Sequence, residues 1–375
     1  MKVEQLSLTG ENWSGDIDTI EIQPNLILLF VSLLFKSKRA LVSKLQERYP
    51  NALLVGCSTA GEISGSKVSD DTVSLSAIEF EKVICKIATV DIINIDKSYE
   101  AGKFLASQLE NENLKHALVF SDGSNVNGAD LVTGLKSILK NTSITGGLSG
   151  YNIDSKEAFI IANSNIVGKK IVGLGFYGQE LNVSFASNGG WDSFGADRLV
   201  TKSKKNIVYE LDGQPASEIY RKFLGEKVNT FPNSGLSFPF SMRVNELDTP
   251  VVRTVRAINE EEHSLVFAAN VPVGSSLRLM NSNADRLIKG AENSAKSAIN
   301  TITQQPELAI LVSCVGRRLL LKQLVEEEVE AVEEVLGKHP KITGFYSFGE
   351  IAPSGNSSPC ELHNQTMTVT TLSEC

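Results

Sequence analysis

The chain contains three short apolar runs that predict buried strands. They lie at 26–32, 117–123 and 308–314, and each ends in small or polar residues. Runs that are apolar at nearly every position are typical of strands covered on both faces, as in parallel sheets. A stretch with helical spacing follows each run, at 38–49, 128–140 and 318–337. The pattern therefore predicts three β-α-β units.

A glycine turn follows the second strand expected in each unit. The peptides GCSTAGEI (56–63) and GFYSFGEI (344–351) share four residues at fixed spacing, and GGLSG (146–150) stands at the corresponding place. In the first two units, 26 positions separate Phe30 from Gly56 and Phe120 from Gly146. A repeat of this kind favours parallel pairing through right-handed crossovers. We expect the turns to do equivalent work in a duplicated architecture.

Alternating, β-rich stretches lie between the units and predict antiparallel meanders, at 72–92, 158–178, 181–188, 253–280 and 366–372. Further helices are expected at 98–109, 215–224 and 284–301, and an ordered irregular loop at 228–250. The predicted fold class is α/β, with mixed sheets built from repeated β-α-β units with antiparallel meanders. Two related domains are expected, at 1–205 and 206–375.

Composition limits the partners of the chain. Its 375 residues exceed one ordinary core, and 42% apolar with 21% charged residues is the balance of a globular protein. A net charge of −8 without long basic runs argues against nucleic acid or an anionic membrane surface as a partner. No apolar run is long enough to cross a bilayer, and the N-terminus lacks the apolar core of a secretory signal. We therefore expect a cytoplasmic protein.

The sequence gives little support to catalysis or to a zinc site. Five cysteines form no CxxC pair, and Cys360 and His363 supply only half of a metal-ligand spacing. Motifs of serine hydrolases, metalloproteases and phosphate-binding loops are absent. Cys57 lies in a glycine turn that would expose a reactive thiolate, but no base is evident beside it. We therefore predict that the chain is not an enzyme.

A small-ligand site is predicted where the turns reach the carboxyl edge of a parallel sheet. Glu62 and Glu350 would there either bind a ligand ammonium group or cap the backbone of a neighbouring loop, and we expect both in one cleft between two halves. Groups that satisfy the amine and the carboxylate of an amino acid surround them. The candidate ligand-binding residues are Cys57, Ser58, Thr59, Gly61, Glu62, Asp122, Arg317, Tyr346, Ser347, Gly349, Glu350 and Asn364.

Several motifs resemble the two parts of the FIST family. VGCSTAGEI, DGSNVNG and ITGGLSG resemble the FIST N domain, while LDGQPASEIY, VPVGSSLRL, SCVGRR, GFYSFGEIAP and ELHNQTMTV resemble the FIST C domain. The resemblance implies a bacterial, cytoplasmic signal-input protein without catalytic activity, which binds a small ligand and regulates a separate protein. The implied partners are a sensor histidine kinase of a two-component system, or a diguanylate cyclase or phosphodiesterase. An interaction scaffold, as in eukaryotic F-box members, is a weaker alternative.

The resemblance also suggests a cofactor. FIST proteins without an output domain resemble the nitric-oxide-sensing haemoproteins called NosP, which implies haem b with nitric oxide as the sensed gas. His363 would then be the iron ligand, because neutral imidazole suits a gas sensor. An amino-acid ligand without haem is the alternative. The sequence leaves open the partner, a homo-oligomeric state, and whether both Gly-Glu turns bind ligand.

Overall fold

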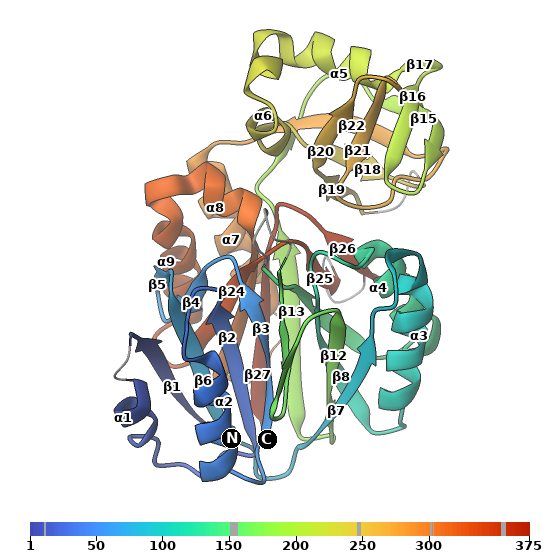
Figure 1. Ribbon diagram of the computed structural model, residues 1–375. Helices are drawn as coiled ribbons and strands as arrows, with labels where there is room; N and C mark the ends of the chain where they lie inside the picture. The colour runs from blue at the N-terminus through green and yellow to red at the C-terminus, as the bar shows by residue number, and fades with distance from the viewer. Residues whose placement is uncertain (11–12, 151–156, 246–248, 301, 303, 354–357) are drawn as a thin grey trace.

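The computed structural model describes residues 1–10, 13–150, 157–245, 249–300, 302, 304–353 and 358–375. It shows a core of three sheets covered by helices, and a smaller domain inserted into the third part of the chain (Figure 1). The expected mixed α/β class with repeated β-α-β units is confirmed. Among the described residues, no helix is both long and apolar enough to cross a membrane.

Each core sheet has six strands and contains one parallel pair. These pairs join β2 (Leu26–Ser32) to β3 (Leu53–Thr59), β8 (Leu114–Ser121) to β9 (Ser143–Leu148), and β23 (Leu308–Cys314) to β24 (Lys341–Ser347). The connections between the paired strands contain α2 (Lys38–Arg48), α4 (Gly128–Ile138), and α8 (Val315–Leu321) with α9 (Val325–Leu336). The three apolar runs of the sequence are thus the first strands of three equivalent units.

The units exchange hairpins with one another. After its second strand, each unit sends a two-stranded hairpin into the sheet of a neighbour. The hairpin β4 (Glu62–Ser64)–β5 (Lys67–Ser69) pairs with β24, β10 (Ile160–Ala162)–β11 (Asn165–Val167) with β3, and β25 (Glu350–Pro353)–β26 (Cys360–His363) with β9. The exchange is cyclic, so each sheet is completed by a strand from another unit.

After its hairpin, each unit returns to its own sheet. The returning strands β6 (Thr72–Glu79), β12 (Lys170–Tyr177) and β27 (Met367–Glu374) lie antiparallel to β2, β8 and β23. An outer strand pairs in turn with each of them: β1 (Lys2–Thr9), β7 (Ile84–Asp91) and β13 (Leu181–Asn188). Three copies of one strand order therefore make up the core.

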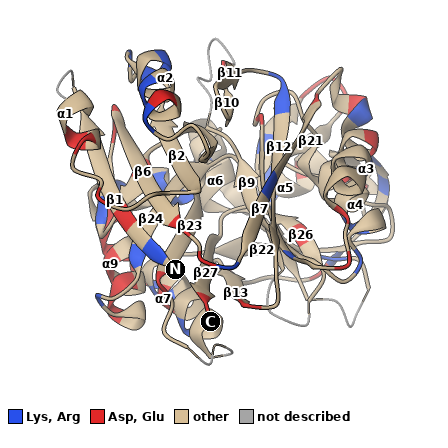
Figure 2. Cartoon of the chain, turned by 90° about the horizontal axis from the view of Figure 1, so that it is seen from below, with Lys and Arg blue, Asp and Glu red and all other residues tan. Residues whose placement is uncertain are grey.

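Both faces of the sheets are covered, which explains why the first strands are apolar throughout. The inner faces meet in a central cluster where the rings of Phe30, Phe120 and Phe345 lie 4.9–5.8 Å apart between centroids. Helices cover the outer faces: α1 (Trp13–Ile17) with α2, α3 (Ser98–Leu109) with α4, and α7 (Ala284–Ile299) with α9. Seen from below, the helices lie around the outside and carry many of the charged residues (Figure 2).

One glycine in each unit allows the parallel strands to approach. Gly56, Gly146 and Gly344 stand at the same register position of the second strand, opposite Leu29, Val119 and Leu311. A Cβ atom on any of them would lie only 1.8–1.9 Å from the carbonyl oxygen of the residue opposite. The spacing that the sequence repeats is therefore a steric requirement of this strand pair.

The turn that precedes each returning strand is also repeated. Asp71, Lys169 and Gln365 each stand shortly before or at the start of β6, β12 and β27, with φ angles of 61°, 51° and 60°. A left-handed backbone is uncommon for residues other than glycine. Its recurrence shows that the three turns have the same geometry although their side chains are acidic, basic and neutral.

The inserted domain lies between β13 and α7 and has its own apolar core. Its sheet contains β14 (Asp192–Ser193), β15 (Arg198–Lys204), β16 (Ile207–Leu211), β17 (Gln214–Pro215), β18 (Phe240–Arg243), β19 (Val251–Arg253), β20 (Val255–Asn259), β21 (Ser264–Phe267) and β22 (Ser276–Asn281). Two helices accompany it, α5 (Ala216–Leu224) and α6 (Asn233–Ser237).

Two local expectations differ from the structure. The stretch 228–250 is not one irregular loop, because it contains α6 and β18, where Phe240 and Met242 alternate into the core. The single helix expected at 318–337 is divided into α8 and α9 by a 3-10 turn at Lys322–Leu324, where Lys322 has a φ of 54°. The remaining predicted helices end within two residues of their expected limits.

The glycine contact makes a stability prediction. Gly344→Ala should lower the free energy of unfolding by about 3 kcal/mol or more, or prevent folding, because the new Cβ meets the Leu311 carbonyl in a buried strand pair. Gly15→Ala is the matched control, since no atom lies within 4 Å of its Cβ position, and should change stability by less than about 1 kcal/mol. Urea unfolding measures both, and similar values for the two variants would contradict the steric explanation.

Candidate functional site

Glu350 occupies a turn that it holds together. Its carboxylate is fully buried and accepts hydrogen bonds from Ser347 Oγ at 2.7 Å, and from Thr366 N and Oγ1 at 3.1 and 2.9 Å. Burial raises the pKa of Glu350 to about 7, although these donors lower it in part. Ser347 belongs to the turn before the exchanged hairpin, and Thr366 to the turn after it. The carboxylate therefore joins the two ends of that hairpin.

Glu62 does the same in the first unit. It is also buried, accepts a hydrogen bond from Thr59 Oγ1, and binds Thr72 N and Oγ1 at 3.1 and 2.7 Å. Burial raises its pKa to about 7 as well. These carboxylates were expected either to bind a ligand ammonium group or to cap a neighbouring loop. In both turns the structure shows capping. Gly61, within the turn, is held against the guanidinium of Arg318, which lies 2.8 Å from its Cβ position.

The other candidate ligand-binding residues of the first two units pack in the core or hydrogen-bond to neighbouring turns. Cys57 is fully buried in the central cluster, where burial raises the pKa of its thiol well above the usual value. Ser58 Oγ donates to Gly150 O at 2.7 Å. The Asp122 carboxylate accepts from Lys169 N at 2.8 Å and from Ser124 N at 2.8 Å. These groups stabilise turns at the sheet edge.

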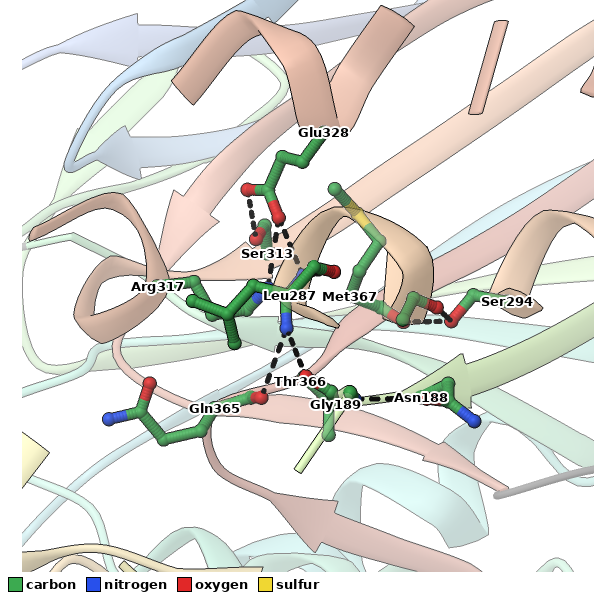
Figure 3. Close-up of polar contacts among 12 residues, drawn as sticks. Asn188, Gly189, Leu287, Ser294, Ser313, Arg317, Glu328, Gln365, Thr366 and Met367 are labelled. Atoms are coloured by element: carbon green, nitrogen blue, oxygen red, sulfur yellow. Dashed lines mark hydrogen bonds and ion pairs between the residues drawn. The ribbon is translucent and has the colours of Figure 1, made fainter. Parts of the chain in front are cut away.

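Arg317 is the centre of a buried polar network (Figure 3). Its Nε and Nη2 donate to the Glu328 carboxylate at 3.0 and 2.7 Å. The same guanidinium donates through Nη1 to Gly189 O and through Nη2 to Leu287 O, both at 2.7 Å. Gly189 follows β13 and Leu287 lies in α7, so Arg317 ties together the two connections to the inserted domain.

The acidic partner of this network is also fully hydrogen-bonded. The Glu328 carboxylate accepts from Ser313 Oγ at 3.0 Å and from the Tyr346 hydroxyl at 2.6 Å. Burial raises the pKa of Tyr346 well above its usual value, and Glu328 acts in the same direction. Arg317 and Tyr346, both expected to contact a ligand, are therefore occupied within the fold. Gly349, in the third unit's turn, accepts from Leu148 N at 2.8 Å.

A cavity of about 300 Å³ lies between the core and the inserted domain. The core contributes the end of β13 together with His363 and Thr366, and the inserted domain contributes β19 and β22. The lining residues are Ser187, Asn188, Gly189, Gly190, Trp191, Thr249, Pro250, Val252, Met280, His363 and Thr366. Its volume and its mixture of hydroxyl, imidazole and apolar groups suit a small polar molecule.

His363 presents a neutral imidazole to this cavity. Its Nε2 lies 2.9 Å from Ala352 O, so this nitrogen carries the proton and Nδ1 is the acceptor. Burial lowers the pKa of His363 to about 4, and the nearby Arg253 acts in the same direction. Among the residues that the structure describes, none hydrogen-bonds to Nδ1. His363 is the only one of the predicted ligand-binding or metal-binding residues among those that line the cavity.

The turn beside His363 contains buried polar atoms that have no partner among the described residues. These are Asn364 Oδ1 and Gln365 Oε1, and both side chains are at least 98% buried. The other end of each amide is used, since Asn364 Nδ2 donates to His363 O at 3.0 Å and Gln365 Nε2 to Leu236 O at 3.1 Å. Buried carbonyl oxygens without donors are uncommon and costly.

Polar contacts across the boundary hold the inserted domain against the core. Arg253, in β19, is buried and donates to Leu362 O at 2.9 Å. Asn270 contacts the start of α4, where it bonds Asn127 at 2.8 Å and Asp130 at 2.7 Å. The sequence did not single out these residues or the inserted-domain lining of the cavity. The stretch 228–250 was expected only as an ordered irregular loop.

The described residues offer no metal-binding cluster of three or more His, Cys, Asp or Glu side chains. Cys360 and His363 have separate partners. The thiol of Cys360 donates to Ile144 O at 3.4 Å, whereas Nε2 of His363 donates to Ala352 O. A haem iron needs only one or two axial side chains and not such a cluster. Nδ1 of His363 has no hydrogen-bond partner among the described residues and could serve as such a ligand.

Comparison with known proteins gives two family matches. The FIST N domain matches residues 25–214 and the FIST C domain residues 216–353. An uncharacterized protein of Methanocaldococcus jannaschii is 25% identical in an alignment of 330 positions that covers 82% of this chain and 63% of that protein. This chain therefore spans less than two thirds of that relative's length.

Two solved structures of cyanuric acid hydrolases also align with the chain. One, from A. caulinodans, has a TM-score of 0.38 and 9% identity, and the other a TM-score of 0.37 and 7% identity. Each alignment covers 100% of this chain and 99% of the other. At these values the likeness carries no argument about activity.

The Arg317 network predicts a large stability difference. Arg317→Met leaves the buried Glu328 without its counter-charge and should lower the free energy of unfolding by about 3–5 kcal/mol. Adding Glu328→Gln should recover part of this loss. Arg48→Met, which removes an exposed ion pair with Asp18, should cost no more than about 1 kcal/mol. Losses of equal size for Arg317→Met and Arg48→Met in urea titrations would show that the network contributes little.

Glu350 predicts a pH dependence. Its pKa is about 7 in the folded protein and 4.5 ordinarily, so in this interval the folded protein holds a proton that the unfolded chain has lost. The stability contributed by that proton is complete below pH 4.5 and is lost as the pH rises to about 7. Glu350→Gln imitates the protonated form and should gain about 3 kcal/mol relative to wild type across this interval.

Urea titrations at about pH 5 and about pH 7.5 measure this relative gain. The exposed Glu47→Gln is the control and should show the same difference from wild type at both pH values. A pH-independent difference for Glu350→Gln would mean that Glu350 is ionised throughout.

Proposed function

Since the chain belongs to the FIST family, whose domains are sensory, we propose that it is a signal-input protein whose small ligand occupies the cavity between the three-sheet core and the inserted domain. The observation that carries the proposal is the neutral imidazole of His363, a residue that lines this cavity and whose Nδ1 has no hydrogen-bond partner among the described residues. The chemistry offered there is binding chemistry. Accordingly we assign the chain no catalytic reaction.

An amino acid is the ligand class that fits best. The cavity of about 300 Å³ combines apolar surface from Trp191, Val252 and Met280 with the hydroxyl groups of Thr249 and Thr366. The ammonium group of an amino acid would donate to His363 Nδ1, which accepts at neutral pH because its pKa is about 4. The Thr249 hydroxyl would donate to the ligand carboxylate, because the Thr366 hydroxyl already donates to Glu350. This pairing leaves each polar group of the ligand with a partner.

The position of the cavity suggests how binding becomes a signal. Its two sides belong to parts of the chain that otherwise meet through polar contacts such as Arg253–Leu362 and Asn270–Asn127. A ligand that touches both sides favours the arrangement in which they are close. The resulting change of surface would act on a separate cytoplasmic partner, for which a sensor histidine kinase or an enzyme of cyclic di-GMP metabolism is our proposal.

Haem, with nitric oxide as the sensed gas, is the second candidate. It is favoured by the same free imidazole nitrogen, which is the kind of iron ligand found in gas sensors. When bound, haem would supply the iron that binds the gas. The cavity is of amino-acid size, so haem binding requires the inserted domain to move away from His363. The two candidates therefore differ in the opening that they demand.

One set of measurements tests both ligands. Thermal unfolding of the wild type with each proteinogenic amino acid should identify at least one that raises the melting temperature. His363→Gln keeps a donor for Ala352 O but loses the imidazole, and should weaken that ligand's binding at least tenfold, a loss of about 1.4 kcal/mol. His116→Gln is the matched control, because His116 is also buried but bonds Ser143 and Thr145 within its own sheet.

Haem is tested on the same proteins by ultraviolet–visible spectroscopy. A Soret band that shifts with nitric oxide, present in wild type and His116→Gln but lost in His363→Gln, would select haem over an amino acid. Stabilisation by an amino acid without such a band would select the first candidate. If no ligand stabilises the wild type, or if His363→Gln behaves as wild type does, the cavity is not the sensory site.

A further inference from the structure

A second groove lies on the inserted domain, on the face of β18 and β22 that points away from its core. Along each strand, alternate side chains point inward, and Phe240, Met242, Leu277 and Leu279 all pack in the apolar core. The side chains between them must therefore face the opposite side. On that side β18 presents Ser241 and Arg243, and β22 presents Ser276 and Arg278. These strands lie in the upper domain of Figure 1.

The register of the two strands brings these four residues together. Ser241 stands opposite Arg278, and Arg243 stands opposite Ser276. The two arginines are therefore diagonal neighbours on one face. The backbones of such neighbours lie roughly 7–8 Å apart. All four line a groove of about 580 Å³, together with Ser193 of the neighbouring strand β14.

The two guanidinium groups have no acidic partner among the described residues. Six other arginines of the chain form ion pairs with carboxylates: Arg48, Arg198, Arg221, Arg286, Arg317 and Arg318. Arg278 instead donates through Nε to Gly195 O at 2.9 Å. This bond orients the guanidinium and leaves its two terminal nitrogens for another acceptor.

Two guanidinium groups on one face of neighbouring strands repel each other unless an anion lies between them. Among the described residues that line the groove, Asp197 is the only acidic one. One carboxylate against two guanidinium groups leaves a local excess of positive charge in a chain whose net charge is −8. The groove therefore has the electrostatics and the donors of an anion site, with serine hydroxyls beside both arginines.

We propose that this groove binds a small molecule that carries a diphosphate group. Guanidinium groups bind phosphate oxygens in pairs through parallel N–H donors, so Arg243 and Arg278 would each hold one phosphate. The hydroxyls of Ser241 and Ser276 would donate to the remaining oxygens. Leu199 and Val244, which are 50% and 49% exposed at the groove, would contact the uncharged part of the molecule.

This site is independent of the cavity at His363. The two share one face of β22, on which Arg278 lines the groove and Met280 lines the cavity. No described residue lines both. Loss of the His363 imidazole should therefore leave the groove unchanged, and the two proposals fail separately.

Isothermal titration of the protein with inorganic pyrophosphate tests the groove. The wild type should bind one equivalent, more weakly as salt is added, because the contacts are ionic and exposed. Arg243→Gln and Arg278→Gln should each weaken binding at least tenfold, and His363→Gln should bind as wild type does. Arg39→Gln, which removes an exposed arginine from α2, is the matched control and should have no effect.

Parallel titrations with orthophosphate and citrate test the ligand class. Both should bind at least tenfold more weakly than pyrophosphate, because neither places two phosphates on the two arginines. Absence of saturable pyrophosphate binding, or binding that survives both groove substitutions, would overturn the site. Citrate binding as tight as that of pyrophosphate would overturn the diphosphate class.

Folding of the variants is checked by circular dichroism and thermal unfolding. Arg243 makes no hydrogen bond or ion pair with another described residue, so Arg243→Gln should unfold at the wild-type temperature. This variant decides the test even if Arg278→Gln, which loses its bond to Gly195, proves less stable.

Discussion

The exchange of hairpins among the three units is the constraint on which the core depends. Each sheet takes an edge strand from a different unit, as when Glu62 of the first unit pairs with Phe345 of the third. The strands that receive a hairpin can do so only because glycine lets the parallel pair beside them approach closely. Buried glutamates then fasten the two ends of two of the hairpins. One β-α-β unit alone would leave a sheet edge open and an inner face uncovered.

This arrangement makes the structure depend on contacts between distant parts of the chain. The central cluster joins Phe30, Phe120 and Phe345, one ring from each unit. Such contacts form only after long loops have closed, which slows folding and links the units in one transition. Burying Glu62 and Glu350 costs free energy. In return, their hydrogen bonds fix turns that hydrophobic packing alone would not orient.

The two connections between the inserted domain and the core meet at one place. Gly190 follows β13 and packs so closely on α7 that a Cβ would lie 1.9 Å from Arg286 O. Arg317 binds both connections from below through Gly189 and Leu287. The domain also contacts the core through hydrogen bonds such as Arg253–Leu362 and through apolar packing of Ala269.

The sequence predicted local structure well because apolar runs and helical spacing record whether a segment is buried. It identified β2, β8 and β23 and the Gly-Glu turns that follow two of the units. It did not reveal the hairpin exchange, because a strand's pattern shows which of its faces is covered but not which strand lies beside it. For the same reason Arg317 was expected at a ligand, since its partner Glu328 is on a helix that looks solvated in sequence.

The cavity and the groove could not be predicted from the sequence, because each is lined by residues from separate segments of the chain. The cavity is lined by four separate segments. Of the described residues that line it, only His363, at the end of β26, was predicted from the sequence as a candidate ligand. The groove depends on the register of β18 and β22, which places Arg243 and Arg278 diagonally although 35 positions separate them in the chain. A cluster of this kind exists only after the strands are paired.

The three left-handed turns show where the symmetry of the molecule ends. Their backbones are alike, yet Asp71 and Lys169 are exposed, whereas Gln365 is buried beneath the inserted domain and bonds Leu236. Only one of three equivalent positions has thus become an interior surface. A molecule that contacted this turn beneath the inserted domain would therefore find one such position in each chain, although the backbone repeats three times.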